Sequence, residues 1–60
     1  MNRDQVVGSF KQIQGEAKRI WGALTDDDFT RAEGSTDKLV GIIQARFGDA
    51  TDAIRRQLRL

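Results

Sequence analysis

Apolar side chains recur at steps of three and four residues along the chain, which is the spacing of one face of an α-helix. No segment alternates apolar and polar residues as a half-buried strand does, and proline is absent. The first apolar stripe consists of Val6, Phe10, Ile13, Ala17, Ile20 and Leu24, with Trp21 beside it. The pattern predicts an all-α fold that opens with one long helix over about residues 3–21, capped at Asn2.

A short second helix is predicted next. Gly22 is expected to end the first helix in the left-handed conformation that glycine tolerates. Thr25 is a favourable cap for the second helix, which should carry Phe29 and Ala32 inward and stop at Gly34. Three carboxylates fill its first turn, where the helix dipole favours negative charge: Asp26, Asp27 and Asp28. Because consecutive helical residues point about 100° apart, this run is typical of capping rather than of a metal site.

Two further helices are expected after Gly34. The third begins at Ser35 or Thr36 and ends at Gly48, with an apolar face made of Leu39, Val40, Ile43 and Phe47. The fourth opens at Asp49 or Thr51, and its expected core residues are Ala50, Ile54 and Leu58. Acids at its start and arginines near its end complement the helix dipole.

One phrase occurs twice, at an offset of 26 residues: Gly-Ser, a later glycine, an aromatic followed by glycine, and Thr-Asp. The first copy uses Gly8, Ser9, Gly15, Trp21, Gly22, Thr25 and Asp26, and the second uses Gly34, Ser35, Gly41, Phe47, Gly48, Thr51 and Asp52. The phrase predicts two helix-turn-helix hairpins packed together. Duplication and coincidence are both open explanations of it.

Three of the glycines, Gly8, Gly15 and Gly41, fall opposite the apolar stripes and are expected to face water. Each should cost about 1 kcal/mol of helix stability relative to alanine. They are either tolerated or needed for local packing, or they leave bare patches that another backbone can approach.

Composition narrows the class of protein. The 60 residues predict a single domain, residues 1–60, with a small core. Cysteine and histidine are both absent, which removes disulfides, thiolate metal sites and the commonest general base. A net charge of +1 gives no strong attraction to nucleic acid or membrane, and the polar start of the chain does not resemble a signal peptide. A cytoplasmic location is therefore expected.

No constellation for catalysis can be assembled: there is no nucleophile elbow, phosphate loop or dinucleotide fingerprint. The sequence predicts a protein that is not an enzyme and has no cofactor. Its candidate interaction residues are Ile42, Arg55, Arg56 and Arg59. Ile42 lies off the main stripe, so burial against the fourth helix and contact with a partner or a second copy are both open. The three arginines could meet phosphates, but nearby acids offset them and the aromatics lie on core stripes, so nucleic-acid binding is not favoured.

Several blocks resemble a known family. They are Trp21 to Asp28 (WGALTDDD), Glu33-Gly34, Asp37 to Gly41 (DKLVG) and Ile43 to Gly48 (IQARFG), together with an opening that has Gly8, Phe10-Lys11-Gln12 and Gly15. These residues resemble the CsbD-like (YjbJ-like) family of small bacterial stress proteins. The resemblance implies a stress-induced cytoplasmic protein with no established biochemical activity, and four helices in two crossed hairpins, similar to SAM-like domains.

The chain also departs from that family's usual pattern. Phe10 stands where many members have tryptophan, Phe47 where tyrosine is usual, and Ile42 and Ala45 where lysine and glutamate are typical. The less charged third helix strengthens the interpretation of Ile42 as a contact residue. The tail after Gly48 is variable in the family, which passes no binding or catalytic residues to this chain.

The expected function is that of a non-enzymatic stress-response protein that acts by protein interaction or protection. The alternative is a small accessory nucleic-acid-binding protein that uses the basic carboxyl-terminal helix, and a metal or small-molecule binder is the least supported class. The expected partner is an unidentified protein, with no membrane partner, and the chain is expected to be a monomer or a weak homodimer.

Overall fold

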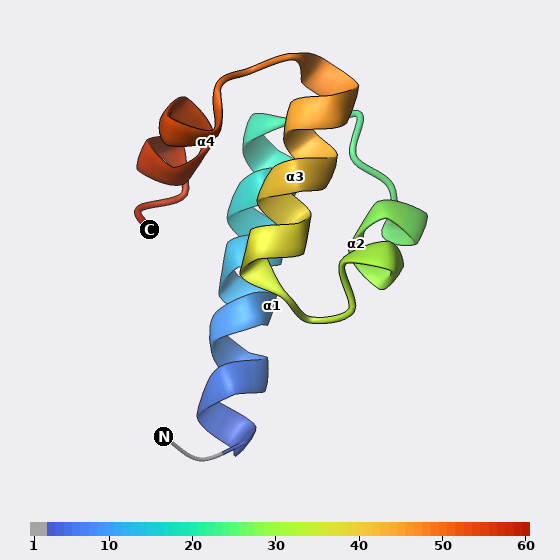
Figure 1. The fold of residues 1–60 in the computed structure, drawn as a ribbon. Coiled ribbons are helices and arrows are strands. Elements are labelled where there is room, and N and C mark those ends of the chain that lie inside the picture. Colours follow the sequence, from blue (N-terminus) through green and yellow to red (C-terminus); the bar gives the residue numbers. More distant parts are fainter. Residues whose placement is uncertain (1–2) are drawn as a thin grey trace.

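Four helices make up the part of the chain that the computed structural model describes, which is the backbone of residues 3–60 and the side chains of residues 10–60. They are α1 (Arg3–Ile20), α2 (Asp26–Ala32), α3 (Thr36–Phe47) and α4 (Thr51–Gln57) (Figure 1). The predicted all-α fold, with one long helix followed by three shorter ones, is confirmed. The expected cap at Asn2 lies outside the described residues. Within residues 3–60, no helix is both long and apolar enough to cross a membrane.

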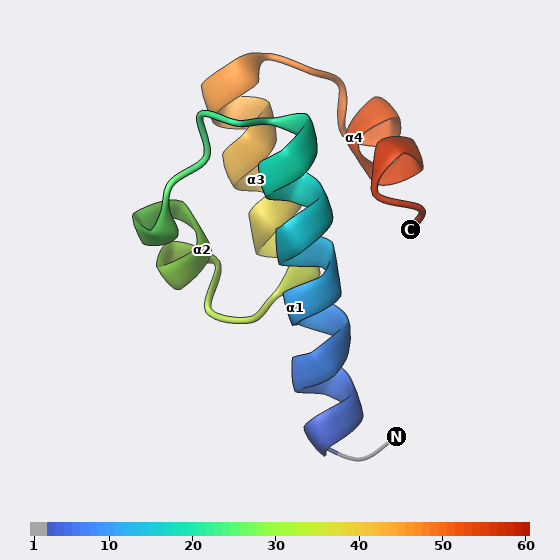
Figure 2. The same ribbon diagram turned by 180° about the vertical axis from the view of Figure 1, so that it is seen from behind.

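The helices are arranged around α3. In Figure 1, α1 and α3 run upwards, whereas α2 and α4 run back down on opposite sides of α3. Both α2 and α4 pack against α3. The hairpins α1–α2 and α3–α4 are thus joined where α2 crosses onto α3. Figure 2, seen from behind, shows that the amino-terminal end of α1 extends beyond the other helices.

A single apolar cluster holds the helices together. Its buried members are Ala17, Trp21, Leu24, Phe29, Ala32, Leu39, Val40, Ile43, Ile54 and Leu58. All of these were expected in the core from their helical spacing. Phe10, Ile13, Ile20, Ile42 and Phe47 are half-buried and pack against the cluster. The prediction for Ala50 is wrong: it is exposed, because it lies in the connection before the first turn of α4.

The helix ends follow the sequence signals except at Gly22. Gly48 ends α3 with φ +78°, and its N–H bonds to the carbonyl of Gln44. Glu33, with φ +54°, and Gly34, with φ +73°, take left-handed conformations after α2. Gly22 does not, so the predicted left-handed stop there is wrong. A tight turn replaces it, in which the N–H of Leu24 donates to the carbonyl of Trp21 at 2.9 Å. That turn places both side chains in the core.

The helix starts differ from one another. Ser35 caps α3, because its hydroxyl accepts from the N–H of Lys38 at 3.3 Å. Thr25 caps α2 as expected. Thr51, one of the two residues predicted to open the fourth helix, is the first residue of α4, and Ala50 before it occupies the cap position and offers no side-chain acceptor.

The exposure predicted for the mid-helix glycines is confirmed where the structure describes it. Gly15 and Gly41 are exposed, and a Cβ built on either would meet nothing within 4 Å. Local packing therefore does not require glycine at these two positions. The burial of Gly8 lies outside the described side chains.

Candidate interaction groove

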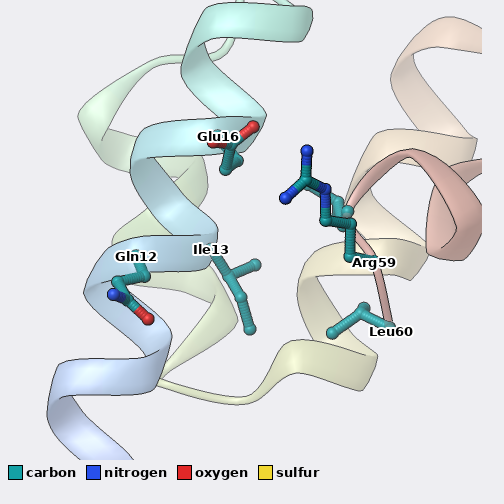
Figure 3. Close-up of a pocket in the computed structure, with 6 residues that line it drawn as sticks. Gln12, Ile13, Glu16, Arg59 and Leu60 are labelled. Atoms are coloured by element: carbon teal, nitrogen blue, oxygen red, sulfur yellow. The ribbon is translucent and has the colours of Figure 1, made fainter.

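A groove of about 420 Å³ separates α1 from the carboxyl-terminal end of the chain, and we call it the α1–α4 groove. The lining residues on α1 are Gln12, Ile13 and Glu16, and those on the opposite wall are Leu58, Arg59 and Leu60. Figure 3 shows Arg59 and Leu60 across the groove from Glu16 and Ile13. Two parts of the chain that are remote in sequence therefore form one concave surface.

Helical spacing builds the α1 wall. Gln12 and Ile13 precede Glu16 by four and three residues, so all three lie on one side of α1. Ile13 is half-buried and joins the floor of the groove to the core. Arg19 donates a hydrogen bond to Glu16 and lowers its pKa, the more distant charge of Arg59 acting in the same direction. Glu16 is therefore a carboxylate at neutral pH, and acts as an acceptor rather than as a general acid.

A turn after α4 builds the opposite wall. The N–H of Leu60 donates to the carbonyl of Arg55 at 2.9 Å, and the N–H of Arg59 donates to the carbonyl of Arg56 at 3.1 Å. These two bonds form a Schellman motif, in which the residue after the cap is left-handed. That residue is Arg59, with φ +60°, a conformation that favours glycine. The turn directs the end of the chain towards α1.

The groove has an apolar floor and a balanced charge. Leu58 is buried, whereas Leu60 is 49% exposed and is the one large hydrophobic side chain exposed among residues 10–60. Glu16 and Arg59 carry opposite charges, so the side chains of the lining have no net charge. Such a surface suits an apolar side chain better than an ionic ligand, because it offers little electrostatic preference for either sign.

Other ligand chemistries find little support in the described side chains. Among residues 10–60, no three carboxylates are grouped so that they could hold a metal ion. Over the same residues, every buried side-chain nitrogen or oxygen has a hydrogen-bond partner.

The residues predicted to interact do not share one face. Arg59 lines the groove, whereas Arg55 points to α3, where its Nη2 lies 2.7 Å from Oδ1 of Asp37. Arg56 is exposed in the last turn of α4. Ile42 is half-buried and packs against the core. The role of these four residues in binding a partner stays a prediction.

Sequence reasoning missed Gln12, Glu16 and Leu60 as lining residues. Glu16 was assigned to solvated polar faces, and no local pattern relates residues 12–16 to residues 58–60. Only the packing of α4 beside α3, together with the turn at Arg59, brings the two segments together.

A buried ionic cluster fixes α2 on the far side of α3 from this groove. Asp28 is 3% exposed and is the one buried charged residue among residues 10–60. Its Oδ2 accepts from the N–H of Thr25 at 2.9 Å and from the guanidinium of Arg46, at the end of α3. The hydrogen bond from the Thr25 backbone is the main cause that lowers the pKa of Asp28, and Arg46 adds to it against the opposing effect of burial. Arg46 also lies over the Phe47 ring, 5.5 Å from its centroid.

Comparison with known proteins identifies the family of the chain. The sequence model of the CsbD-like family matches residues 4–56. The chain belongs to the CsbD-like family. The resemblance predicted from its motifs is thereby confirmed. CsbD-like proteins form a general stress-protein family whose molecular activity is uncharacterised.

This CsbD-like chain is similar over nearly its whole length to curated bacterial proteins. A UPF0337 protein of Bordetella pertussis is 48% identical over 98% of this chain and 89% of its own length. A UPF0337 protein of Pectobacterium atrosepticum is 49% identical over 98% of this chain and 86% of its own. The UPF0337 protein YjbJ of Escherichia coli K12 is 47% identical over 97% and 84%. No solved structure matches the chain, so the expected likeness to SAM-like domains stays a prediction.

Proposed function

We propose that this CsbD-like protein acts without catalysing a reaction, by binding apolar segments of other proteins and protecting them from aggregation during stress. The observation that carries the proposal is the α1–α4 groove, where the exposed Leu60 adjoins the apolar floor formed by Ile13 and Leu58. A solvated apolar side chain beside a concave apolar floor gains free energy when another apolar group covers both.

The groove suits weak and unselective binding. Burial of one leucine-sized side chain contributes about 1.5–3 kcal/mol, which alone gives only transient contact. The opposed charges of Glu16 and Arg59 leave the lining side chains with no net charge and hence with no strong preference for one client sequence. These properties fit a protein that must meet many partly unfolded proteins rather than one specific partner. We expect the protein itself to be a monomer or a weak homodimer.

The nucleic-acid alternative has less support. Arg55 lies beside the carboxylate of Asp37, and Arg59 faces Glu16 across the groove, so both guanidinium groups have acidic neighbours. To bind phosphates, these arginines would have to give up or share their carboxylate neighbours. The free energy of binding gained from counterion release would then be smaller.

The test is the thermal aggregation of a bystander enzyme, followed by light scattering. The wild-type protein should delay aggregation in proportion to its concentration, and Leu60→Ser should protect less well. The control is Gln57→Ser, which changes an exposed residue of α4 outside the groove and should protect as the wild type does.

Circular dichroism would verify that both variants keep their helices. Absence of any protection by the wild type would refute the proposal. If Leu60→Ser protects the bystander enzyme as well as the wild type does, the groove is not the site of protection. Salt-sensitive retardation of duplex DNA at physiological ionic strength would favour the alternative function instead.

A further inference from the structure

We infer that α4 is a displaceable cover, and that its release extends the α1–α4 groove onto the apolar side of α3. The binding step of this inference rests on the proposed function, whereas the release of α4 is a property of the fold that can be measured separately. The occupant of the uncovered surface would be an apolar segment of a partly unfolded protein.

The start of α4 is weakly fixed. The helix is only seven residues long, and a helix this short depends on tertiary packing. Ala50 provides no side-chain cap. Gly48, with its left-handed backbone, and the extended Ala50 form the connection from α3. One side-chain hydrogen bond ties this connection to the first half of the chain, from the indole N–H of Trp21 to Asp49 at 3.0 Å.

The outer side and the end of α4 are also weakly fixed. The ion pair between Arg55 and Asp37 is exposed on both sides, with side chains that are 44% and 80% accessible, so solvent screens it. Arg59, after the helix, takes a left-handed conformation that a non-glycine residue adopts at a cost, as Glu33 does after α2. Beyond it, the groove separates the end of the chain from α1 (Figure 3).

The helix α2, which has the same length as α4, is attached more firmly to the rest of the fold. It also has seven residues, but Thr25 and Asp28 form a complete capping box at its start. Asp28 is buried and bonds to Arg46 of α3. Phe29 and Ala32 of α2 are both buried in the core. Heating should therefore open α4 before α2, since local opening begins where a segment has the fewest stabilising contacts.

Release of α4 would uncover a surface that continues the groove. Ile54 and Leu58 are the residues through which α4 enters the core, at 0% and 5% exposure. Leu58 belongs both to the core and to the lining of the groove, so it joins the two surfaces. Leu39, Val40 and Ile43 are the buried residues of α3, the helix against which α4 packs. An apolar segment could thus extend from the groove into the space that α4 leaves.

Amide hydrogen exchange tests the release. The informative amides are those of Ile54 and Leu58, which bond to the carbonyls of Ala50 and Ile54 at 3.0 Å, and the amide of Phe29 in α2. We expect protection in α4 to be at least about tenfold lower than in α2, and the difference to grow on heating towards the melting temperature. Equal protection of the two helices would overturn the inference.

A capping variant sharpens this measurement. Ala50→Ser adds the missing acceptor at the start of α4 and should slow the exchange of Ile54 and Leu58 about fivefold, with Phe29 unchanged. Ala45→Ser, at an exposed position within α3, is the matched control and should not slow exchange in α4. If Ala50→Ser slows exchange equally in α2 and α4, then α4 does not open separately.

A cross-link tests whether binding requires the release. The chain has no cysteine, so Asp37→Cys with Arg55→Cys places the only two thiols where α3 and α4 already face each other. A short bis-maleimide would lock α4 in place, and the same variant treated with a monofunctional maleimide is the control. Protection of the bystander enzyme should fall at least about threefold on locking and persist in the control, as expected where binding selects an open state.

The outcomes separate the two proposals. Equal protection by the locked and control proteins would overturn the role of α4 as a cover and leave the proposed function standing. Absence of protection by the wild type as well would refute the proposed function together with the binding step, and hydrogen exchange would still decide whether α4 opens by itself.

Discussion

The helices α2 and α4 have the same length and nearly the same sequence signal, yet they are attached to the fold in different ways. Each begins at a Thr-Asp pair that follows an aromatic–glycine pair, and the two phrases are offset by 26 residues. In α2, Thr25 precedes the helix and caps it, whereas in α4 the equivalent Thr51 is the first helical residue and Ala50 takes the cap position. The equivalent threonines therefore have different structural roles in the two helices.

The residue three positions after the threonine explains the difference. After Thr25 it is Asp28, which completes a capping box and reaches Arg46. After Thr51 it is Ile54, which cannot return a hydrogen bond and instead enters the core with no exposed surface. Polar groups hold the start of α2 in addition to its buried apolar side chains, whereas the start of α4 has no side-chain cap and the helix relies on the buried Ile54.

Ile54→Ala should cost about 2–5 kcal/mol of the free energy of unfolding, because it removes the fully buried anchor of α4 and leaves a cavity. For a domain of this size, such a loss approaches the whole stability. Urea denaturation followed by Trp21 fluorescence would measure it. Ile54→Val is the matched control and should cost about 0.5–1.5 kcal/mol. A loss below 1 kcal/mol for Ile54→Ala would show that α4 is not anchored through this residue.

Acid should weaken the attachment of α2 through Asp28. Its folded-state pKa is lowered from the ordinary 3.8, so the unfolded chain takes up a proton first as the pH falls. The stability that the carboxylate contributes is complete above about pH 4 to 5 and is lost as the pH falls through the folded-state pKa. Asp28→Asn should be less stable than the wild type at pH 7, and the difference should shrink towards pH 2.

Glu16→Gln is the control for this acid titration, because the pKa of Glu16 is also lowered but its carboxylate lies on α1, away from the capping box. Thermal melts at each pH would record both variants. If the gap between Asp28→Asn and the wild type stays constant from pH 7 to pH 2, the carboxylate of Asp28 does not stabilise the start of α2.

Replacement of the two equivalent threonines should have unequal effects. Thr25→Ala removes a cap and should cost about 1 kcal/mol, within a range of about 0.5–2. Thr51→Ala should change the stability by less than about 0.5 kcal/mol, because its side chain makes no cap at the start of α4. Urea midpoints of the two variants, measured side by side, would decide. Equal losses would mean that the repeated threonines act alike after all.

The carboxyl ends of the two helices should behave alike, and with a smaller effect. Both are followed by a non-glycine residue in the left-handed region, Glu33 with φ +54° and Arg59 with φ +60°. Glu33→Gly and Arg59→Gly should each raise the free energy of unfolding by up to about 1 kcal/mol, because glycine adopts this conformation without strain. A gain at one end and a loss at the other, in thermal melts, would show that their surroundings differ more than the backbone indicates.

The two helix junctions also contact each other, which the repeated phrase did not predict. Trp21 belongs to the first aromatic–glycine pair, and its indole donates to Asp49, which follows the second pair. Asp49 was one of the two residues expected to open α4, but it lies before the helix and ties the connection to Trp21 at the end of α1. A carboxylate that can cap a helix can also accept a hydrogen bond from a distant donor. Only the three-dimensional neighbours decide which of the two roles it takes.

Local signals in the sequence determined the number, order and approximate limits of the helices, the apolar stripes and the cap at Thr25. They sufficed because helix periodicity and capping depend on residues within four positions of each other. The sequence motifs also indicated the CsbD-like family. Tertiary structure alone decided that Asp28 meets Arg46, that Asp49 meets Trp21, and that Glu16 and Arg59 face each other across a groove. These contacts join residues 18 to 43 positions apart, and no local periodicity encodes which distant side chains become neighbours when helices pack.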